Sequence, residues 1–214
     1  MKYKLIALIA LLFIGCNQKK TEIEDKSTVK DPVEILQPIP ADTTFTIIPG
    51  VSVGETVLGN STETLSVLGK PDFSDAAMGK AWLLWYKQIK EIPKQVKWMI
   101  YTTYKDNELK EKVISEIRIN SGEYKTESGI GAGTSFEVIQ KEFPKITEFA
   151  KYKNQEINKD IYIYDVPGSG IAFEFISYEG DYAKCTAVIV YPKNKTLNTD
   201  YILFLPEREL KKRE

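Results

Sequence analysis

The fold is decided by two stretches that share one pattern, Gly59-Asn60-Ser61-Thr62-Glu63 and Gly133-Thr134-Ser135-Phe136-Glu137, which begin 74 residues apart. In each stretch the second residue (Asn60 or Thr134) can cap a helix, and the glutamate three positions later can close a capping box. A short apolar-periodic segment follows each cap and ends near a proline. The sequence therefore predicts two short helices in equivalent positions.

Three strand-like runs follow each predicted helix, and β-branched and aromatic residues dominate all six. The turns between them are short, which favours antiparallel meanders over helical crossovers. The runs are residues 81–88, 95–104 and 112–119 after the first helix, and residues 160–166, 170–178 and 184–191 after the second. We therefore predict an α+β fold in which two tandem α-β-β-β repeats, residues 45–122 and 123–206, form an antiparallel sheet with short helices on one face. The apolar run 201–205 is expected to form an edge strand or to lie across the sheet.

The first sixteen residues have the pattern of a bacterial lipoprotein signal. Lys2 and Lys4 precede an apolar run of about ten residues, which is too short to span a bilayer as a helix. The run ends in Phe13-Ile14-Gly15-Cys16, which resembles a lipobox. The resemblance implies that residues 1–15 are removed and that Cys16 receives diacylglycerol and a further acyl chain such as palmitate. Two alternatives stay open: an ordinary secretory signal followed by a chance cysteine, and a short buried helix.

The next segment, residues 16–44, is polar, charged and interrupted by prolines. It has no strand or helix periodicity, which predicts a flexible linker between the lipid anchor and the folded domain. Two or three acyl chains hold a protein stably on a membrane. We therefore expect a membrane-bound protein of the bacterial cell envelope, at the outer membrane. Whether it faces the periplasm or the outside is open. Residues 207–214 form a charged tail.

Composition excludes many catalytic classes. The 214 residues include no histidine, which rules out Ser-His-Asp and Cys-His nucleophilic sites and histidine-ligated metals. With Cys16 and Cys185 as the two cysteines, a four-cysteine zinc or iron–sulfur site cannot form. The balance of 29 basic and 30 acidic residues does not favour nucleic-acid binding. We expect no metal and no cofactor, and we interpret Cys185 as a buried, inert thiol without a disulfide partner.

Carboxylates leave one catalytic possibility. Asp72 and Asp75 follow the first predicted helix, and Asp160 and Asp165 bracket a predicted strand. Paired carboxylates about 5–10 Å apart can hydrolyse glycosides, which keeps a hydrolase as a third hypothesis. However, the segment that holds Asp72 and Asp75 equally fits a turn, and the glycine-rich segment 129–133 lacks the Lys-Ser/Thr of a phosphate-binding loop. The sequence therefore favours a protein that is not an enzyme.

Several short motifs resemble the small outer-membrane lipoproteins of the SmpA/OmlA kind: the helix start at Gly59, the helix end Leu68-Gly69-Lys70-Pro71, and the following strand with Trp82 and Tyr86. The tandem arrangement is similar to that of β-lactamase inhibitor proteins, in which two such units make one concave antiparallel sheet. The resemblance covers about 150 residues and implies architecture more than a target. The second copy departs from the first, with Phe143 in place of Gly69, and the paired disulfides of the secreted inhibitors cannot form here.

The aromatic residues are the main indication of function. Two short helices can cover one face of a sheet, so we expect the other face to be partly open. Exposed tyrosine and tryptophan side chains on a rigid sheet form good protein-binding surfaces. We predict that this chain binds an envelope protein of unknown identity, as a scaffold, assembly factor or inhibitor. Two alternatives remain: the rings pack the core and rim, or the protein binds a small ligand or glycan in a pocket. The predicted binding residues are Trp85, Tyr101, Tyr162, Tyr164 and Tyr178.

Overall fold

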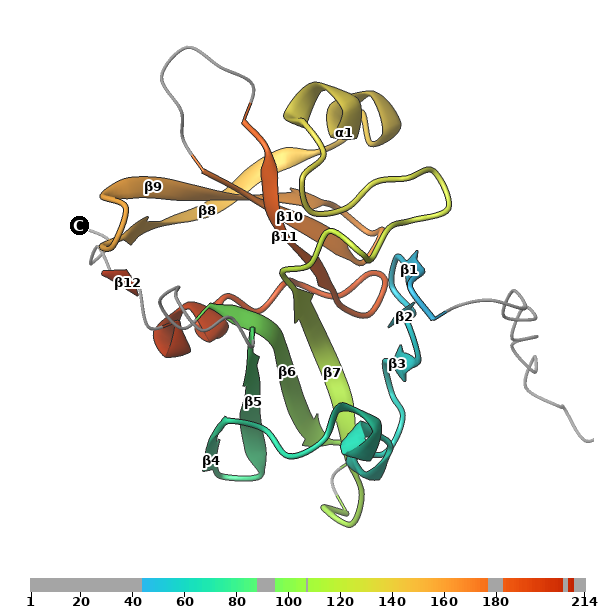
Figure 1. Ribbon diagram of the computed structural model, residues 1–214. Coiled ribbons are helices and arrows are strands. Elements are labelled where there is room, and N and C mark those ends of the chain that lie inside the picture. The colour runs from blue at the N-terminus through green and yellow to red at the C-terminus, as the bar shows by residue number, and fades with distance from the viewer. Residues whose placement is uncertain (1–43, 88–94, 107, 177–182, 206–207, 210–214) are drawn as a thin grey trace, which may run out of the picture. The chain divides into compact units, whose positions relative to one another are not determined.

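The computed structural model (Figure 1) describes residues 44–87, 95–106, 108–176, 183–205 and 208–209. All of them belong to the second of two compact units, Ile39–Glu214. The predicted signal peptide, Cys16, all but the last residue of the linker, and most of the charged tail lie outside the described residues. These predictions therefore stay predictions.

Within the described residues, nine strands form one antiparallel sheet in the order β12-β8-β9-β10-β11-β7-β6-β5-β4. Two four-stranded meanders make up most of this sheet, and they join where β7 pairs with β11. The first meander consists of β4 (Phe73–Ala77), β5 (Lys80–Tyr86), β6 (Val96–Tyr104) and β7 (Lys112–Ile119). The second consists of β8 (Thr147–Asn154), β9 (Lys159–Val166), β10 (Ile171–Ile176) and β11 (Cys185–Val190), and β12 (Arg208–Glu209) pairs with β8.

A short helical segment precedes each meander. η1 (Thr62–Leu68) is a 3₁₀ helix, and α1 (Phe136–Glu142) is an α-helix of the same length. The chain enters η1 and α1 through the same kind of backbone contact. The N–H of Gly59 donates to a carbonyl of β7 at 2.8 Å, and the N–H of Gly133 donates to a carbonyl of β11 at 2.7 Å. In the described part of the chain, no helix is long and apolar enough to cross a membrane.

Both helical segments start one residue later than predicted. The N-cap residues are Ser61 and Ser135, not Asn60 and Thr134. The hydroxyl of Ser61 accepts a hydrogen bond from the backbone N–H of Glu63 at 3.3 Å, whereas the Ser135 side chain makes no capping hydrogen bond. The shared pattern thus marks both helix starts, but the two caps differ in their chemistry.

The prediction of an α+β fold with two tandem α-β-β-β repeats is wrong. Of the residues that the structure describes, 46% lie in strands and 13% in helical segments, so this part of the chain is mostly β. Four strands, not three, follow each of the helical segments η1 and α1. The strands absent from the prediction are β4 and β8. Their side chains are largely exposed, so neither shows the apolar pattern by which a strand is recognised.

One face of the sheet is covered by η1, α1 and a small N-terminal sheet. This three-stranded antiparallel sheet consists of β1 (Ile47–Ile48), β2 (Ser52–Val53) and β3 (Thr56–Val57). Its apolar side chains and those of the two helices pack on alternate residues of the large sheet, which buries them from water. The buried members of this first core cluster include Ile47, Val53, Leu65, Trp85, Trp98, Ile100, Ile119, Ile139, Phe173, Phe175 and Val188.

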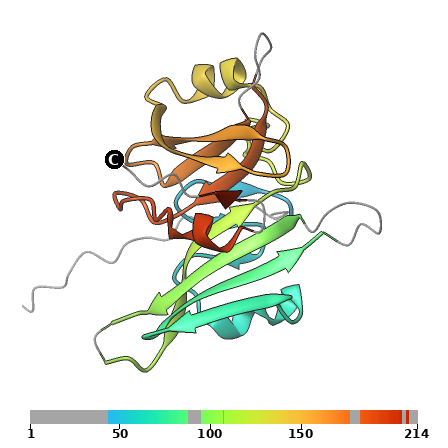
Figure 2. The same cartoon turned by 90° about the vertical axis from the view of Figure 1, so that its left-hand side faces the viewer.

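The opposite face is covered by the segment after β11, residues 197–205. This segment contains the 3₁₀ helix η2 (Asp200–Phe204). Figure 2 shows it in front of the strands, with β1–β3 behind them. The run 201–205 thus lies across the sheet, and helical segments cover both faces, which corrects the prediction that they keep to one. The second core cluster includes Trp82, Leu84, Met99, Ile163, Ile189, Leu197, Tyr201, Ile202 and Leu205.

Candidate functional site

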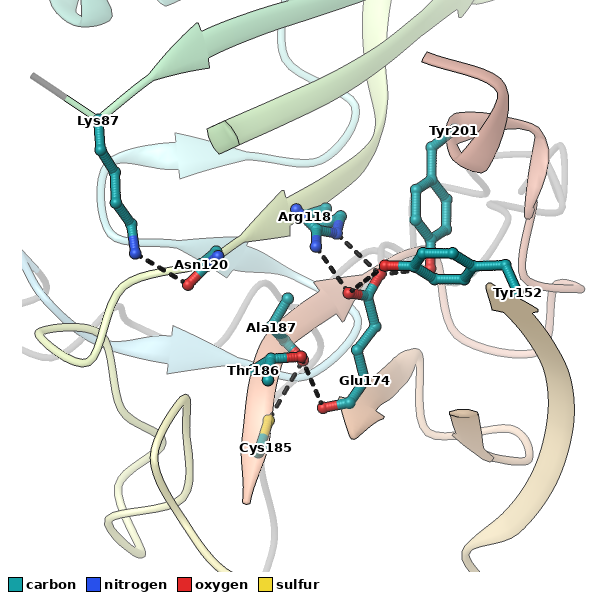
Figure 3. Close-up of polar contacts among 9 residues, drawn as sticks. All are labelled: Lys87, Arg118, Asn120, Tyr152, Glu174, Cys185, Thr186, Ala187 and Tyr201. Atoms are coloured by element: carbon teal, nitrogen blue, oxygen red, sulfur yellow. Dashed lines mark hydrogen bonds and ion pairs between the residues drawn. The ribbon is translucent and has the colours of Figure 1, made fainter. Parts of the chain in front are cut away.

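A buried ion pair bridges the two meanders. Arg118 comes from β7 and Glu174 from β10, and β11 runs between these strands. Arg118 Nε donates to Glu174 Oε1 at 2.8 Å, and Nη2 donates to Oε2 at 2.6 Å (Figure 3). The two side chains are 4% and 1% exposed. Burial alone would lower the pKa of Arg118, but the carboxylate of Glu174 raises it above its ordinary value, so the guanidinium stays charged.

Two tyrosines complete the surroundings of Glu174. The hydroxyl of Tyr201, from η2, donates to Oε1 at 2.6 Å, and the hydroxyl of Tyr152, from β8, donates to Oε2 at 3.3 Å. The Arg118 guanidinium carbon also lies 5.7 Å from the centre of the Tyr201 ring. This network therefore ties β7, β8 and β10 to the segment that covers the sheet. Such satisfied networks offset the cost of burying charge.

The third guanidinium nitrogen of Arg118 differs from the other two in its hydrogen bonding. Nη1 is buried and has no hydrogen-bond partner among the described residues. When Nε and Nη2 hold a carboxylate, the planar guanidinium points Nη1 away from it. A buried, charged N–H group without an acceptor is unfavourable and rare in folded proteins. The described residues therefore leave this nitrogen, like Oε1 of Glu116, without a hydrogen-bond partner.

Arg118 lines a pocket of about 440 Å³, a volume within the range of small-molecule sites. Residues from both meanders form its walls. The buried lining residues are Arg118, Ala132, Tyr152, Ile161, Glu174 and Cys185. The more exposed lining residues include Gln95, Asn120, Asn154, Glu156, Ile157, Ile176 and Thr186. The pocket thus combines a charged group at depth with apolar and amide side chains nearer to solvent.

A second cation stands beside this pocket. Lys87, which follows β5, donates from Nζ to Asn120 Oδ1 at 3.1 Å and to Gln95 Oε1 at 3.5 Å. Burial lowers the pKa of Lys87, and the positive charges of Arg118 and Lys97 lower it further. Figure 3 shows Lys87 reaching Asn120 on the side of Arg118 opposite to Glu174. The positive charge of Arg118 therefore acts on Lys87.

Nucleophilic or metal chemistry finds no support among the described residues of this site. Cys185 lines the pocket, but burial raises the pKa of its thiol well above the usual range, and its Sγ donates to the carbonyl of Ala187 at 3.2 Å. In the part of the chain that the structure describes, no group of three histidine, cysteine, aspartate or glutamate residues could hold a metal ion.

The four aspartates considered for glycoside hydrolysis do not come together. Asp72 and Asp75 lie before and within β4, at one end of the sheet, whereas Asp160 and Asp165 lie in β9, beyond the junction of the meanders. Asp72 accepts a backbone N–H of β5 at 2.7 Å, and Asp165 accepts the hydroxyl of Tyr191. These two bonds connect Asp72 to β5 and Asp165 to Tyr191.

The predicted protein-binding residues are not gathered on one surface. Trp85 is 7% exposed and lies in the core beneath η1, where its Nε1 donates to the carbonyl of Gly69 at 3.2 Å. It therefore lacks the exposed side chain that the prediction requires. Tyr164 is half-buried on the same face of the sheet and contacts the rings of Phe136 and Phe175.

The remaining predicted residues lie elsewhere. Tyr101 is half-buried on the opposite face and stacks on Trp82, with ring centres 4.5 Å apart. Tyr162 is half-buried on β9, with Lys151 Nζ 5.6 Å from its ring centre. Tyr178 lies outside the described residues, as does Cys16.

Sequence reasoning missed Arg118, Glu174 and Lys87 as site residues. In the sequence, Arg118 and Glu174 are charged residues between apolar neighbours: Arg118 stands between Ile117 and Ile119, and Glu174 stands between two phenylalanines. Strand alternation assigns such residues to a solvent-facing side. Only the covering of that side by residues 197–205 places them in the interior.

No protein-family model matches the sequence, and no curated protein matches it. Among solved structures, the chain is similar to the uncharacterized protein yfeY from Escherichia coli, with a TM-score of 0.43 and 16% sequence identity. The match covers 70% of this chain and 99% of that chain. A likeness at this level carries no argument about function.

Proposed function

We propose that this chain is a lipid-anchored, non-enzymatic protein of the bacterial cell envelope that binds a small ligand in the pocket lined by Arg118. One observation carries the proposal: a pocket of about 440 Å³, a volume within the range of small-molecule sites, is lined by apolar and polar residues from both meanders. Ligand binding is the alternative function that the sequence left open, and the pocket favours it over an open aromatic face.

The test of ligand binding is to fill the pocket without touching Arg118. Ile176 is a half-buried lining residue, so Ile176→Trp places a large ring in the pocket. Ile146→Trp, at a half-buried position that does not line this pocket, is the matched control. Thermal unfolding is measured with a panel of small carboxylates, amides and sugars, because a ligand that binds the folded state raises the Tm. We expect a compound class that stabilises the native protein and the control but not Ile176→Trp; equal stabilisation of all three proteins would contradict this site.

Lipid anchoring is tested separately at Cys16. Cys16→Ser removes the thiol to which diacylglycerol would be attached. We expect the native protein to fractionate with membranes and to carry acyl mass, and the variant to lose both properties. Membrane association that persists in Cys16→Ser would exclude this anchor.

Protein binding around Tyr101 is a second candidate, favoured by one observation. Phe73, which is 43% exposed, lies on the same face as the stacked pair of Trp82 and Tyr101, and Phe204 packs 6.0 Å from Trp82. A photo-crosslinking amino acid in place of Phe73 is expected to trap one discrete envelope protein, with less product in Tyr101→Ala. The same substitution at Phe149, an exposed position in β8, is the control. Identical products from both positions would count against a specific surface.

A further inference from the structure

The strand β4 forms an open edge of the large sheet. It is the last strand in the order, and within the described residues it pairs with β5 alone. An edge strand presents backbone N–H and C=O groups to which another extended chain can add, and many proteins protect such edges with lysine, proline or a bulge. None of these is present in β4, whose five side chains are all exposed and whose register with β5 is unbroken. One charge, that of Asp75, protects this edge.

Three bonds near the end of β5 show which of its backbone groups face β4. The carbonyl of Leu84 accepts the N–H of Asp72 at 2.9 Å, and the N–H of Tyr86 donates to Asp72 Oδ2 at 2.7 Å. The N–H of Lys87 points the other way and donates to the carbonyl of Gln95, just before β6, at 2.8 Å. Backbone groups alternate in direction along a strand, so the even-numbered residues of β5 direct theirs to β4.

The pairing register then identifies the free backbone groups of β4. Its residues opposite the even-numbered positions of β5 are Phe73, Asp75 and Ala77, whose N–H and C=O groups therefore face β5. Ser74 and Ala76 lie between them and direct their backbone groups outward. The turn and loop hydrogen bonds of the described residues include neither Ser74 nor Ala76. This edge therefore offers two donors and two acceptors in the spacing that an added strand requires.

The side chains of β4 restrict what the added strand can carry. Phe73, which is 43% exposed, and Asp75 lie opposite Leu84 and Trp82, on the face where Tyr101 stacks on Trp82. In an antiparallel addition, residues opposite Phe73 and Asp75 form non-hydrogen-bonded pairs, in which side chains come closest. Aromatic residues pair well with β-branched ones across strands. A β-branched residue therefore fits opposite Phe73.

The charge of Asp75 selects the kind of partner. Asp75 forms no ion pair in the described part of the chain, and neither does Lys80, the lysine opposite Ala77. A lysine or arginine directly opposite Asp75 would be stabilising, whereas an acidic residue would be destabilising. If β4 of a second copy added antiparallel through both Ser74 and Ala76, the two Asp75 side chains would lie opposite each other. The charge therefore disfavours pairing between copies and favours a basic segment of another protein.

We infer that β4 binds an extended segment of another protein by strand addition, with a lysine or arginine opposite Asp75 and a β-branched residue opposite Phe73. The segment pairs with the backbone of Ser74 and Ala76, which supplies affinity, and its alternate side chains supply specificity. This inference rests on the second candidate function, protein binding beside Phe73, and names the kind of segment that is bound. It does not depend on the pocket lined by Arg118.

The first test uses a synthetic peptide, Thr-Val-Thr-Lys-Thr-Val-Thr, acetylated and amidated at its ends, which is titrated into the full chain and followed by amide NMR. We expect shifts at Ser74 and Ala76 and none at Glu137 in α1. N-methylation of the two threonines beside the lysine removes the N–H groups that donate to β4, so it should abolish binding. N-methylation of the two valines, whose N–H groups face away from β4, is the matched control and should preserve binding.

Charge reversal tests the part that Asp75 plays. A peptide with glutamate in place of its lysine is expected to bind the native chain about fivefold more weakly. Asp75→Lys should reverse this preference, because the like charges then belong to the lysine peptide. Glu148→Lys, at an exposed position in β8, makes the same change in net charge away from β4 and should keep the native preference.

A proline tests the edge itself. The N–H of Ala76 faces outward, so Ala76→Pro removes an edge donor without removing a hydrogen bond between β4 and β5. We expect this variant to lose peptide binding while circular dichroism and Tm stay close to those of the native protein. Ala76→Ser keeps the N–H and is expected to bind as the native chain does.

The outcomes separate this inference from the function on which it rests. Absence of peptide shifts at Ser74 and Ala76, or equal binding of the lysine and glutamate peptides, overturns the inference. A native dimer that Ala76→Pro dissociates would make a second copy the occupant and also overturn it. If photo-crosslinking at Phe73 traps the same protein in Ala76→Pro as in the native chain, protein binding stands and strand addition fails. If nothing discrete is trapped at Phe73 in the native chain, both fail.

Discussion

Glu116, in the middle of β7, accepts the backbone N–H of Asn198 through Oε2 at 3.1 Å, and this bond ties the sheet to the segment that covers it. Glu116 is 2% exposed, and its Oε1 has no hydrogen-bond partner among the described residues. Burial raises the pKa of Glu116 to about 8, with a further contribution from the negative charge of Asp200, while the Asn198 bond acts in the opposite direction. Glu116 is therefore protonated in the folded protein at neutral pH.

This elevated pKa predicts a stability that depends on pH. The folded protein keeps the proton on Glu116 up to about pH 8, whereas the unfolded chain releases it near the ordinary value of 4.5. The contribution of Glu116 to stability is therefore fully present below pH 4.5 and is lost as the pH rises to about 8. The slope in this window is about 1.4 kcal/mol per pH unit.

Glu116→Gln cannot ionise, so the variant is expected to gain stability relative to the native protein between pH 5 and pH 9. Urea unfolding at several pH values measures this difference. Glu127→Gln, at an exposed position, should follow the native curve throughout. A difference between Glu116→Gln and the native protein that stays constant from pH 5 to pH 9 would contradict the prediction.

The buried pair of Arg118 and Glu174 predicts non-additive effects on stability. Arg118→Met leaves the Glu174 carboxylate buried with only its two tyrosine donors, and we expect a loss of about 3–5 kcal/mol in the free energy of unfolding. The double variant Arg118→Met with Glu174→Met is expected to recover much of that loss, because it leaves no unpaired charge. As a control, Lys110→Met breaks an exposed ion pair and should cost less than about 1 kcal/mol. Strictly additive losses at the two buried positions would refute this account.

The two helix starts predict different costs for the same substitution. Ser61→Ala removes a capping acceptor for the Glu63 N–H and is expected to cost about 0.5–1 kcal/mol. Ser135→Ala removes no capping hydrogen bond and should cost less. Thermal unfolding of the two variants measures the difference, and a larger loss for Ser135→Ala would be inconsistent with the structure.

The burial of Cys185 predicts an unreactive thiol. The side chain is 3% exposed, and burial raises the pKa of the thiol, so little thiolate forms at pH 8. Iodoacetamide is expected to leave Cys185 unmodified in the native protein and to alkylate it fully in urea, as mass spectrometry of its peptide would report. Rapid alkylation without denaturant would mean that the pocket exposes this sulfur.

The central strands could be predicted from the sequence, and the edge strand could not. The run 112–119 coincides with β7, because its β-branched residues, Val113, Ile114, Ile117 and Ile119, identify a strand. In β4 all five side chains are exposed, so no apolar alternation marks it. The turn after it consists of Met78 and Gly79, both with positive φ, and methionine is not a residue that signals such a turn.

The site was beyond prediction for a different reason. Arg118 and Glu174 are 56 residues apart, and their pairing requires the order in which the meanders join. Their burial further requires that Tyr201 and its neighbours lie across the sheet. The pattern of a single strand contains neither piece of information, so a charged residue within it is assigned to solvent.

Residues 197–205 cover one face of the two meanders and follow both of them in the sequence. This order has a consequence for how the protein folds. Until this segment docks, one face of the sheet is exposed to water, and Arg118 and Glu174 are hydrated on it. Tyr201 reaches Glu174 only after the last of the meander strands has been synthesised. Docking of this segment therefore completes the second core cluster and encloses the pair of Arg118 and Glu174 in one step.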